Sequence, residues 1–108
     1  MKALTNNRVQ ETFAESVWKT CKRIPKGKVS TYAGIAKMIG RPKSARAVGN
    51  ALNKNPYAPV VPCHRVVRSD GSVGGFASGS LKKGKLLKGE GVAIKNGRVV
   101  PLEKYLYI

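Results

Sequence analysis

A cysteine and the only histidine of the 108-residue chain are neighbours, in the stretch 62–67, PCHRVV. A thiol beside an imidazole can be a nucleophile with its base, half of a metal site, or ordinary core filling. Two cysteines, Cys21 and Cys63, with one histidine and no Cys-x-x-Cys pair, make neither a familiar zinc site nor a disulfide framework. On an extended segment, neighbouring side chains point to opposite faces, so His64 need not touch Cys63. The residues alone leave nucleophile and core filling both open.

The surroundings of Cys63 favour reactivity. The segment lies between a stiff proline-containing loop, 55–59, and the glycine- and serine-rich stretch 74–80, which can bring its backbone close to a ligand. Arg65 follows directly, and positive charge near a cysteine favours thiolate over thiol. We therefore expect Cys63 to be able to react as an anion, although the spacing names no electrophile.

The overall charge indicates a polyanionic partner. Twenty-one Lys and Arg against five Asp and Glu give a net charge of +16 at pH 7. This imbalance favours nucleic acid over a membrane surface, and both over a merely solvated lysine coat. No apolar run approaches the roughly 20 residues of a membrane span, and no apolar signal core begins the chain. We expect a cytoplasmic protein without membrane contact, associated with the nucleoid if the source is prokaryotic.

Three helices must position these residues. An apolar residue every fourth position from Val9 to Cys21 predicts a first helix, capped at Asn6 or Asn7 and stopped at Pro25, with Cys21 as a buried small hydrophobe. A second helix is expected to follow a cap at Ser30 or Thr31 and to end at Gly40. A third is predicted over 44–53, burying Val48 and Leu52. Two short helices joined by a Gly-Arg-Pro turn are typical of a helix-turn-helix.

The side chains on the free face of the third helix are small, apart from that of Arg46. Small side chains let a helix enter a minor groove about 6 Å wide, whereas a major-groove helix normally carries several long polar side chains. Tight helix packing explains small residues equally well, so the sequence leaves this choice even. The small residues are Ser44, Ala45, Ala47 and Gly49.

The C-terminal part predicts short strands and one more helix. The segment 60–67 is rich in β-branched residues, 69–72 is a turn, 81–88 is expected to be the final helix, and Asn96-Gly97 signals a tight hairpin. The fold class that follows is mainly α or α+β, a small winged helix-turn-helix-like domain with a few short strands.

These motifs resemble the C-terminal catalytic domain of the O6-alkylguanine-DNA alkyltransferases, also called methylated-DNA–protein-cysteine methyltransferases. The likeness runs from about Val9 to Val92 and rests on four segments: SARAVGNALNKNP, PCHRVV, VGGFASG and LLKGEG. It implies a single-turnover DNA repair protein that flips O6-methylguanine out of double-stranded DNA and moves the alkyl group irreversibly to its own cysteine. No cofactor or metal is expected, because the family's zinc belongs to an N-terminal domain. We expect residues 1–108 to form the catalytic and DNA-binding domain alone, as a monomer.

The resemblance implies catalytic roles for four residues. Cys63 accepts the alkyl group, His64 acts as its base through a bridging water, and Glu90 orients His64. Asn55 is expected to hold the turn that positions the cysteine. The substrate pocket is expected to include Val66, Phe76 and Ala77. Phe76 stands where tyrosine is common and can stack on guanine without donating a hydrogen bond to O6, a task left to backbone N–H groups near Ala77.

The resemblance also places the third helix in the minor groove. Arg46 is expected to fill the space left by the extruded base, and Tyr32 to push the adjacent phosphate as the nucleotide rotates. The other expected DNA contacts are Ala33, Arg41, Ser44, Ala45, Ala47, Gly49 and Ser69.

Two other functions remain as alternatives. Non-catalytic alkyltransferase-like proteins resemble the same domain, bind alkylated guanine and flag it for excision, but characteristically lack the reactive cysteine. A helix-turn-helix regulator would carry long side chains for base readout on the third helix and a dimer surface. Neither of these regulator features is evident in the sequence.

Overall fold

The computed structural model describes residues 11–56, 60–73 and 80–107, the last from the backbone alone at 80 and 81. Five α-helices, a short 3-10 helix and four two-residue strands lie in these ranges, which confirms the predicted fold class. In chain order they are α1 (Phe13–Lys22), β1 (Ser30–Thr31), α2 (Tyr32–Met38), α3 (Ala45–Asn53), η2 (Cys63–Arg65), β2 (Val66–Val67), α4 (Ser80–Gly89), β3 (Ile94–Lys95), β4 (Arg98–Val99) and α5 (Leu102–Tyr105).

Helix α1 begins at a reciprocal cap. The Thr12 hydroxyl accepts a hydrogen bond from the Glu15 backbone N–H at 3.1 Å, and the Glu15 carboxylate accepts one from the Thr12 N–H at 2.9 Å. Because this pair satisfies two otherwise free N–H groups, the helix starts at Phe13, and the prediction of a cap at Asn6 or Asn7 is wrong. Val9 lies outside the described residues. The helix ends at Lys22, ahead of Pro25 as predicted.

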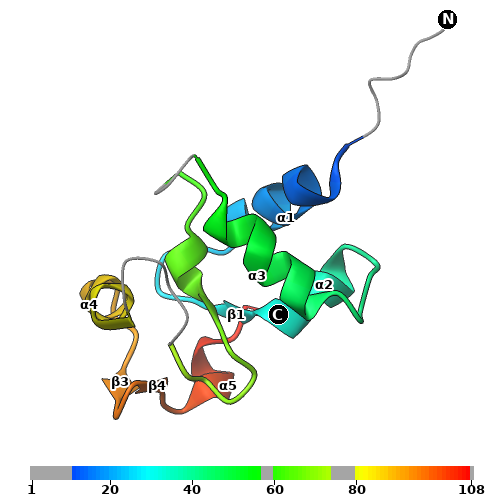
Figure 1. Ribbon diagram of the computed structural model, residues 1–108. Helices are drawn as coiled ribbons and strands as arrows, with labels where there is room; N and C mark the ends of the chain where they lie inside the picture. The colour runs from blue at the N-terminus through cyan, green and yellow to red at the C-terminus, as the bar shows by residue number, and fades with distance from the viewer. Residues whose placement is uncertain (1–10, 57–59, 74–79, 108) are drawn as a thin grey trace, which may run out of the picture.

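The predicted helix-turn-helix is confirmed by α2, α3 and the turn between them. The Thr31 hydroxyl caps α2 by accepting from the Gly34 N–H at 2.9 Å. Gly40, at φ +78°, ends the helix, and the Arg41 N–H turns back to the Ala36 carbonyl at 2.8 Å. Helix α3 then crosses α1 and α2, as Figure 1 shows.

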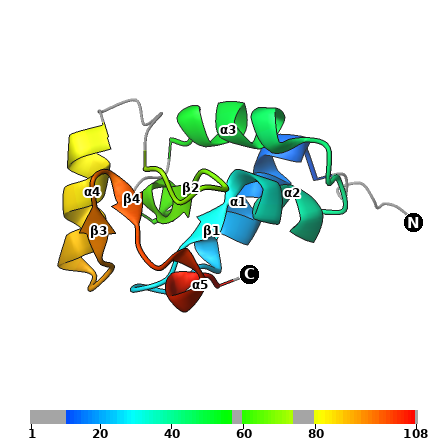
Figure 2. The same cartoon turned by 90° about the horizontal axis from the view of Figure 1, so that it is seen from below.

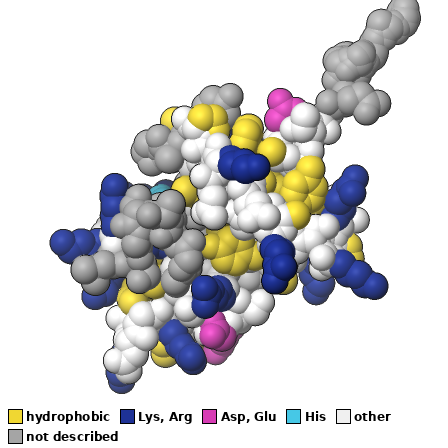
Figure 3. All heavy atoms as spheres, viewed as in Figure 1, with side chains coloured by type: hydrophobic (Ala, Val, Ile, Leu, Met, Phe, Trp, Pro, Cys, Tyr) yellow, Lys and Arg dark blue, Asp and Glu magenta, His cyan; other side chains and the backbone are white. Residues whose placement is uncertain are grey.

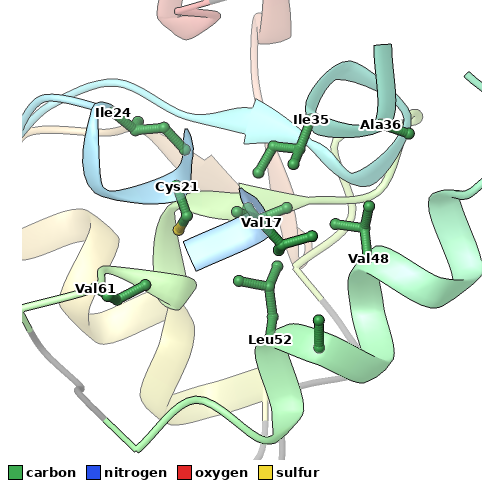
Figure 4. Packing of buried hydrophobic residues seen from close by; sticks show 10 residues of the cluster. Val17, Cys21, Ile24, Ile35, Ala36, Val48, Leu52 and Val61 are labelled. Carbon is green, nitrogen blue, oxygen red and sulfur yellow. The ribbon is translucent and has the colours of Figure 1, made fainter. Parts of the chain in front are cut away.

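The three N-terminal helices share one core. Val17 of α1, Ile35 of α2 and Val48 of α3 have no exposed surface, and Leu52 is 5% exposed (Figure 4). Each fully buried side chain of this size contributes about 1.5–3 kcal/mol. The Trp18 indole N–H also donates to the Ala51 carbonyl at 2.8 Å, which fastens α1 to the end of α3. The core therefore fixes the orientation of α3.

A second core lies under α4 and the hairpin β3–β4, on the other side of the molecule in Figures 1 and 2. The hairpin turns through Asn96 at φ 52° and Gly97 at φ 74°, which confirms the prediction from the Asn-Gly pair. The buried residues of this core are Val29, Val67, Val73, Leu87, Val92 and Val99.

The two halves are tied together by backbone pairing. β1 and β2 run parallel, with Ser30 opposite Val66, so the start of α2 is held beside the segment that follows Cys63. The helix predicted over 81–88 is confirmed as α4, but it is not the final one, because α5 follows the hairpin; four residues are too few to show a helical period in the sequence. In the part of the chain that the structure describes, no helix is long and apolar enough to cross a membrane.

Candidate active site and nucleic-acid interface

The cysteine segment is a tight turn and not the extended strand that the β-branched residues suggested. η2 covers Cys63–Arg65, and only Val66 and Val67 are extended. Pro62 precedes the turn and accepts the Arg65 N–H at 2.9 Å, in keeping with the preference of proline for the start of a helical turn. The argument that Cys63 and His64 point to opposite faces of a strand therefore does not apply. Cys63 is half-buried at the start of the turn, and His64 is 6% exposed.

Asn55 lies where it can hold this turn from the end of α3. Its side-chain amide donates to the Val61 carbonyl at 3.0 Å, two residues ahead of Cys63. This contact links the helix-turn-helix directly to the cysteine segment. This contact is consistent with the positioning role that the resemblance implied for Asn55. The role itself stays a prediction.

His64 and Glu90 come together although 26 residues separate them. Glu90 follows α4 directly, and its Oε2 lies 3.0 Å from His64 Nε2. The hydrogen bond from Arg65, ahead of that from His64, lowers the pKa of Glu90 to about 2, against the opposing effect of burial. Glu90 is therefore ionised near neutral pH and can only accept hydrogen bonds. His64 Nε2 must then carry a proton, and in the neutral form of the imidazole Nδ1 has a free lone pair that can act as a base.

Arg65 is the member of this cluster whose contacts the sequence did not reveal. Its Nε and Nη2 donate to the two Glu90 oxygens at 2.9 and 2.7 Å, and its Nη1 donates to the Ile24 carbonyl at 2.8 Å. The expectation that Arg65 simply adds positive charge near Cys63 therefore needs correction, because its charge is matched by a bidentate carboxylate. Arg65 instead anchors Glu90 and the end of α1 to the turn.

Lys83 is a second residue that sequence reasoning missed. It is fully buried, and its Nζ donates to the Tyr32 hydroxyl at 3.3 Å and lies 5.6 Å from the Tyr32 ring centre. Burial lowers the pKa of Lys83 to about 8 and raises the pKa of Tyr32. A lysine in the lysine-rich run of α4 carries no sequence signal of burial. The structure thus connects α4 to the tyrosine that the resemblance assigned to DNA.

A surface hollow of about 480 Å³ brings most of the predicted DNA contacts together. It lies between α2, α3 and the residues that follow β2. Six of its residues were predicted as DNA contacts: Tyr32, Ala33, Ala45, Arg46, Gly49 and Ser69. The prediction overlooked three more: Asn50, Asn53 and Arg68. These two asparagines show that the side chains around Arg46 are not all small, which corrects the prediction from the sequence.

Three predicted contacts lie outside this hollow. Arg41 is stacked toward the Phe13 ring, with its guanidinium carbon 6.0 Å from the ring centre. Ser44 precedes α3 as its N-cap residue, and Ala47 is exposed on α3. All three still belong to the helix-turn-helix.

The predicted substrate pocket is described only in part. Phe76 and Ala77 lie outside the described residues. The assignment of Val66 to the pocket stays a prediction, and the structure shows its side chain fully buried in the core of α1–α3. The reason is the parallel pairing with Ser30, which draws β2 into the interior.

Cys21 packs in the same core, as expected for a small hydrophobe. Burial raises the pKa of its thiol to about 12, so it stays protonated. Among residues 11–56, 60–73 and 80–107, no group of three or more His, Cys, Asp and Glu side chains could hold a metal ion.

Positive charge dominates the face that carries α3 (Figure 3). Arg46 and Arg68 line the hollow, and no acidic residue is among the described residues that do so. Asp70 directly follows a lining residue, Ser69, in the sequence, and its carboxylate lies 3.8 Å from the Arg98 guanidinium. The hollow is therefore suited to an anionic ligand.

Comparison with known proteins gives a consistent match. Residues 12–92 match the family model described as 6-O-methylguanine DNA methyltransferase, DNA binding domain. The chain is 54% identical over 79 residues to the methylated-DNA–protein-cysteine methyltransferase of Methanosarcina acetivorans, covering 73% of this chain and 51% of the relative. It thus spans about half the length of the curated relatives it matches.

Two solved structures with DNA are similar over most of this chain. One is S. pombe Atl1 in complex with damaged DNA containing O6-carboxymethylguanine, at 34% identity and TM-score 0.80, covering 89% of this chain and 94% of that chain. The other is Mycobacterium tuberculosis OGT in complex with DNA, at 44% identity and TM-score 0.71, covering 73% of this chain and 48% of that chain. On this evidence the chain belongs to the 6-O-methylguanine DNA methyltransferase family of DNA-binding repair proteins.

Proposed function

We propose that this chain repairs O6-alkylguanine in double-stranded DNA by taking the alkyl group onto Cys63, once per molecule. The observation that carries the proposal is the chain of contacts behind Cys63: the next residue, His64, is buried and bonded to an ionised Glu90, which Arg65 holds in place. A nucleophile, a base and an orienting carboxylate are the parts that activated-nucleophile chemistry requires. Residues 1–108 hold both these groups and the DNA-facing helix-turn-helix.

The chemical step is a displacement at carbon. The Cys63 sulfur forms a bond to the alkyl carbon, the bond from that carbon to guanine O6 breaks, and the electron pair stays on the guanine. His64 Nδ1 takes the thiol proton through a water molecule. A proton is then returned to the released nucleobase, which becomes guanine. The product is a thioether with no good leaving group, so the protein does not turn over. No cofactor takes part in this step.

Binding of DNA through α3 precedes this step. Ala45 and Gly49 have small side chains, so the surface of the helix does not project far at these positions, and a Cβ on Gly49 would make ordinary van der Waals contact with the Tyr32 ring at 3.7 Å. Arg46 rises from this surface and can occupy the gap left by an extruded base, while Tyr32, which lines the same hollow, is expected to push the adjacent phosphate. Extrusion is required because O6 of a stacked, paired guanine cannot be attacked in line.

Non-catalytic binding of alkylated DNA is the second candidate. It is favoured by the similarity to S. pombe Atl1 in complex with damaged DNA, at TM-score 0.80. The presence of Cys63 beside His64 favours transfer.

Mass spectrometry after incubation with an O6-methylguanine duplex separates the two. Transfer predicts a gain of about 14 Da on Cys63 in a stoichiometric fraction of molecules, because one methyl group replaces one hydrogen. The Cys63→Ala variant should gain nothing, and Cys21→Ala, which alters only a buried thiol, should gain the same mass as the wild type. Tight lesion binding with unchanged mass would instead assign the non-catalytic function.

A further inference from the structure

Four residues of α3 form one stripe along the hollow. Gly49 and Asn50 are three and four positions after Arg46, and Asn53 is seven positions after it, so the four residues lie on the same side of the helix, and all of them line the 480 Å³ hollow. Along the helix axis, Asn50 and Asn53 lie about 6 and 10 Å beyond Arg46. Two carboxamides therefore continue the surface that Arg46 begins.

These carboxamides have no structural task within the described part of the chain. Both side chains are exposed, and no hydrogen bond joins either of them to a described residue. Asparagine is also a poorer helix former than alanine, so neither residue supports α3 by its intrinsic propensity. Their polar groups are available to a ligand in the hollow.

The chemistry of a carboxamide suits one feature of the minor groove. Every base pair presents acceptors there, at purine N3 and pyrimidine O2, and only a G·C pair adds a donor, the guanine N2 amino group. Arginine carries donors only and cannot recognise that amino group. An asparagine can donate to N3 and accept from the N2 amino group of the same guanine.

We infer that Asn50 and Asn53 read the minor-groove edges of the base pairs beside the lesion and favour guanine there. This inference rests on the proposed function, because it requires α3 to lie in the minor groove with Arg46 at the lesion. A spacing of about 6 and 10 Å corresponds to roughly two and three base-pair steps of 3.4 Å. Repair should then depend on sequence at those positions, with no change in the lesion itself.

Inosine provides the test, because an I·C pair lacks only the N2 amino group. The Cys63→Ser protein, which cannot transfer, is titrated by fluorescence anisotropy against O6-methylguanine duplexes at one salt concentration. Each duplex carries a G·C or an I·C pair at one of the three positions on either side of the lesion. Replacing guanine by inosine at one or two positions should weaken binding about fivefold or more, and replacements elsewhere should have no effect.

The variants locate the effect. Adding Asn50→Ala or Asn53→Ala should make binding to the matching G and I duplexes equal, and circular dichroism should show an unchanged fold. Lys85→Ala, on the exposed surface of α4, should weaken binding to both duplexes alike and keep the preference. Equal binding of all G and I duplexes by a protein that still binds DNA would overturn the inference and leave the proposed function standing. A preference for guanine that survives both alanine variants would have the same two consequences. Absence of any DNA binding would overturn both.

Discussion

At the scale of single residues, Glu90 is the centre of the site. One carboxylate accepts two hydrogen bonds from Arg65 and one from His64, and its side chain is 14% exposed. The bidentate pairing keeps the carboxylate ionised, and the ionised carboxylate in turn fixes the tautomer of His64. The position of His64, the proposed base, therefore depends on Arg65, which directly follows it in the sequence.

Acid should unfold the protein through Glu90. Its pKa is lowered from 4.5 to about 2, so the contribution to stability is complete above pH 4.5 and is lost as the pH falls from 4.5 toward 2. The shift corresponds to roughly 3 kcal/mol of unfolding free energy. Urea unfolding at pH 7, 4 and 3 should show this loss in the wild type and a much flatter profile in Glu90→Gln. Glu103→Gln, at an exposed position of α5, should retain the wild-type profile, and an equally flat profile there would contradict the assignment.

Lys83 is expected to support alkyl transfer while lowering the stability of the fold. Because burial lowers its pKa from 10.5 to about 8, it is charged at neutral pH in an environment that disfavours the charge, and stability should rise between pH 8 and 10.5 as the proton is lost. At pH 7, Lys83→Met should raise the unfolding free energy by about 1–3 kcal/mol. It should also slow transfer about tenfold, since the hydrogen bond to Tyr32 is lost.

Lys82→Met is the matched control for this variant, because Lys82 is exposed on the same helix. Urea unfolding and a single-turnover rate on an O6-methylguanine duplex measure both effects. A destabilised Lys83→Met with an unchanged rate would contradict the prediction.

At the scale of elements, the turn between α2 and α3 decides where α3 lies. Gly40 adopts φ +78°, and the Arg41 and Gly40 N–H groups return to the Ala36 and Lys37 carbonyls. This arrangement closes the end of α2 and sends the chain directly into α3. The cap at Thr31 and the β1–β2 pairing hold the other end of α2 beside the cysteine turn.

Gly40→Ala should test that turn. No atom lies within 4 Å of a Cβ built at Gly40, so the cost is confined to the left-handed backbone and should be about 1–2 kcal/mol. Gly89→Ala makes the same chemical change at the end of α4, where space is equally open and φ is not positive, and should leave stability unchanged or slightly raise it. Thermal unfolding of both variants gives the comparison; equal melting temperatures would contradict the role of Gly40.

At the scale of the whole molecule, charge dominates. The chain carries a net charge of +16, and three of its five acids are already engaged with described cations: Glu11 with Lys19, Asp70 with Arg98, and Glu90 with Arg65. Most of the positive charge is left for an external anion. The lesion-independent part of DNA binding should come from this excess.

Binding to undamaged duplex should therefore weaken steeply with salt. If about five phosphates are contacted, log K should fall with log salt at a slope near −4 to −5. Anisotropy titrations between 50 and 200 mM salt measure the slope, which corresponds to a loss of roughly 250- to 1,000-fold in affinity over that range. A slope near zero would contradict a charge-driven encounter.

Local features of this protein followed from its sequence. The Asn96-Gly97 hairpin, the end of α2 at Gly40 and the apolar sides of α1 and α3 depend on φ preferences and on helical period, which a short stretch of residues already contains. The adjacency of Cys63 and His64 was likewise visible in six residues, although those residues alone left nucleophile and core filling both open. The proposed partner, DNA that carries an alkylated base, came from the resemblance of the surrounding motifs together with the charge.

The contacts that make these residues a site were not accessible in this way. Arg65 meets Glu90 across 25 positions, and Lys83 meets Tyr32 across 51. The turn at Cys63 and the burial of Val66 also depend on distant segments, through Asn55 and Ser30. Hydrogen bonding and burial act between groups that packing brings close, whatever their separation along the chain, so only the folded arrangement of α4 against the helix-turn-helix could reveal which charges are matched and which lysine is buried.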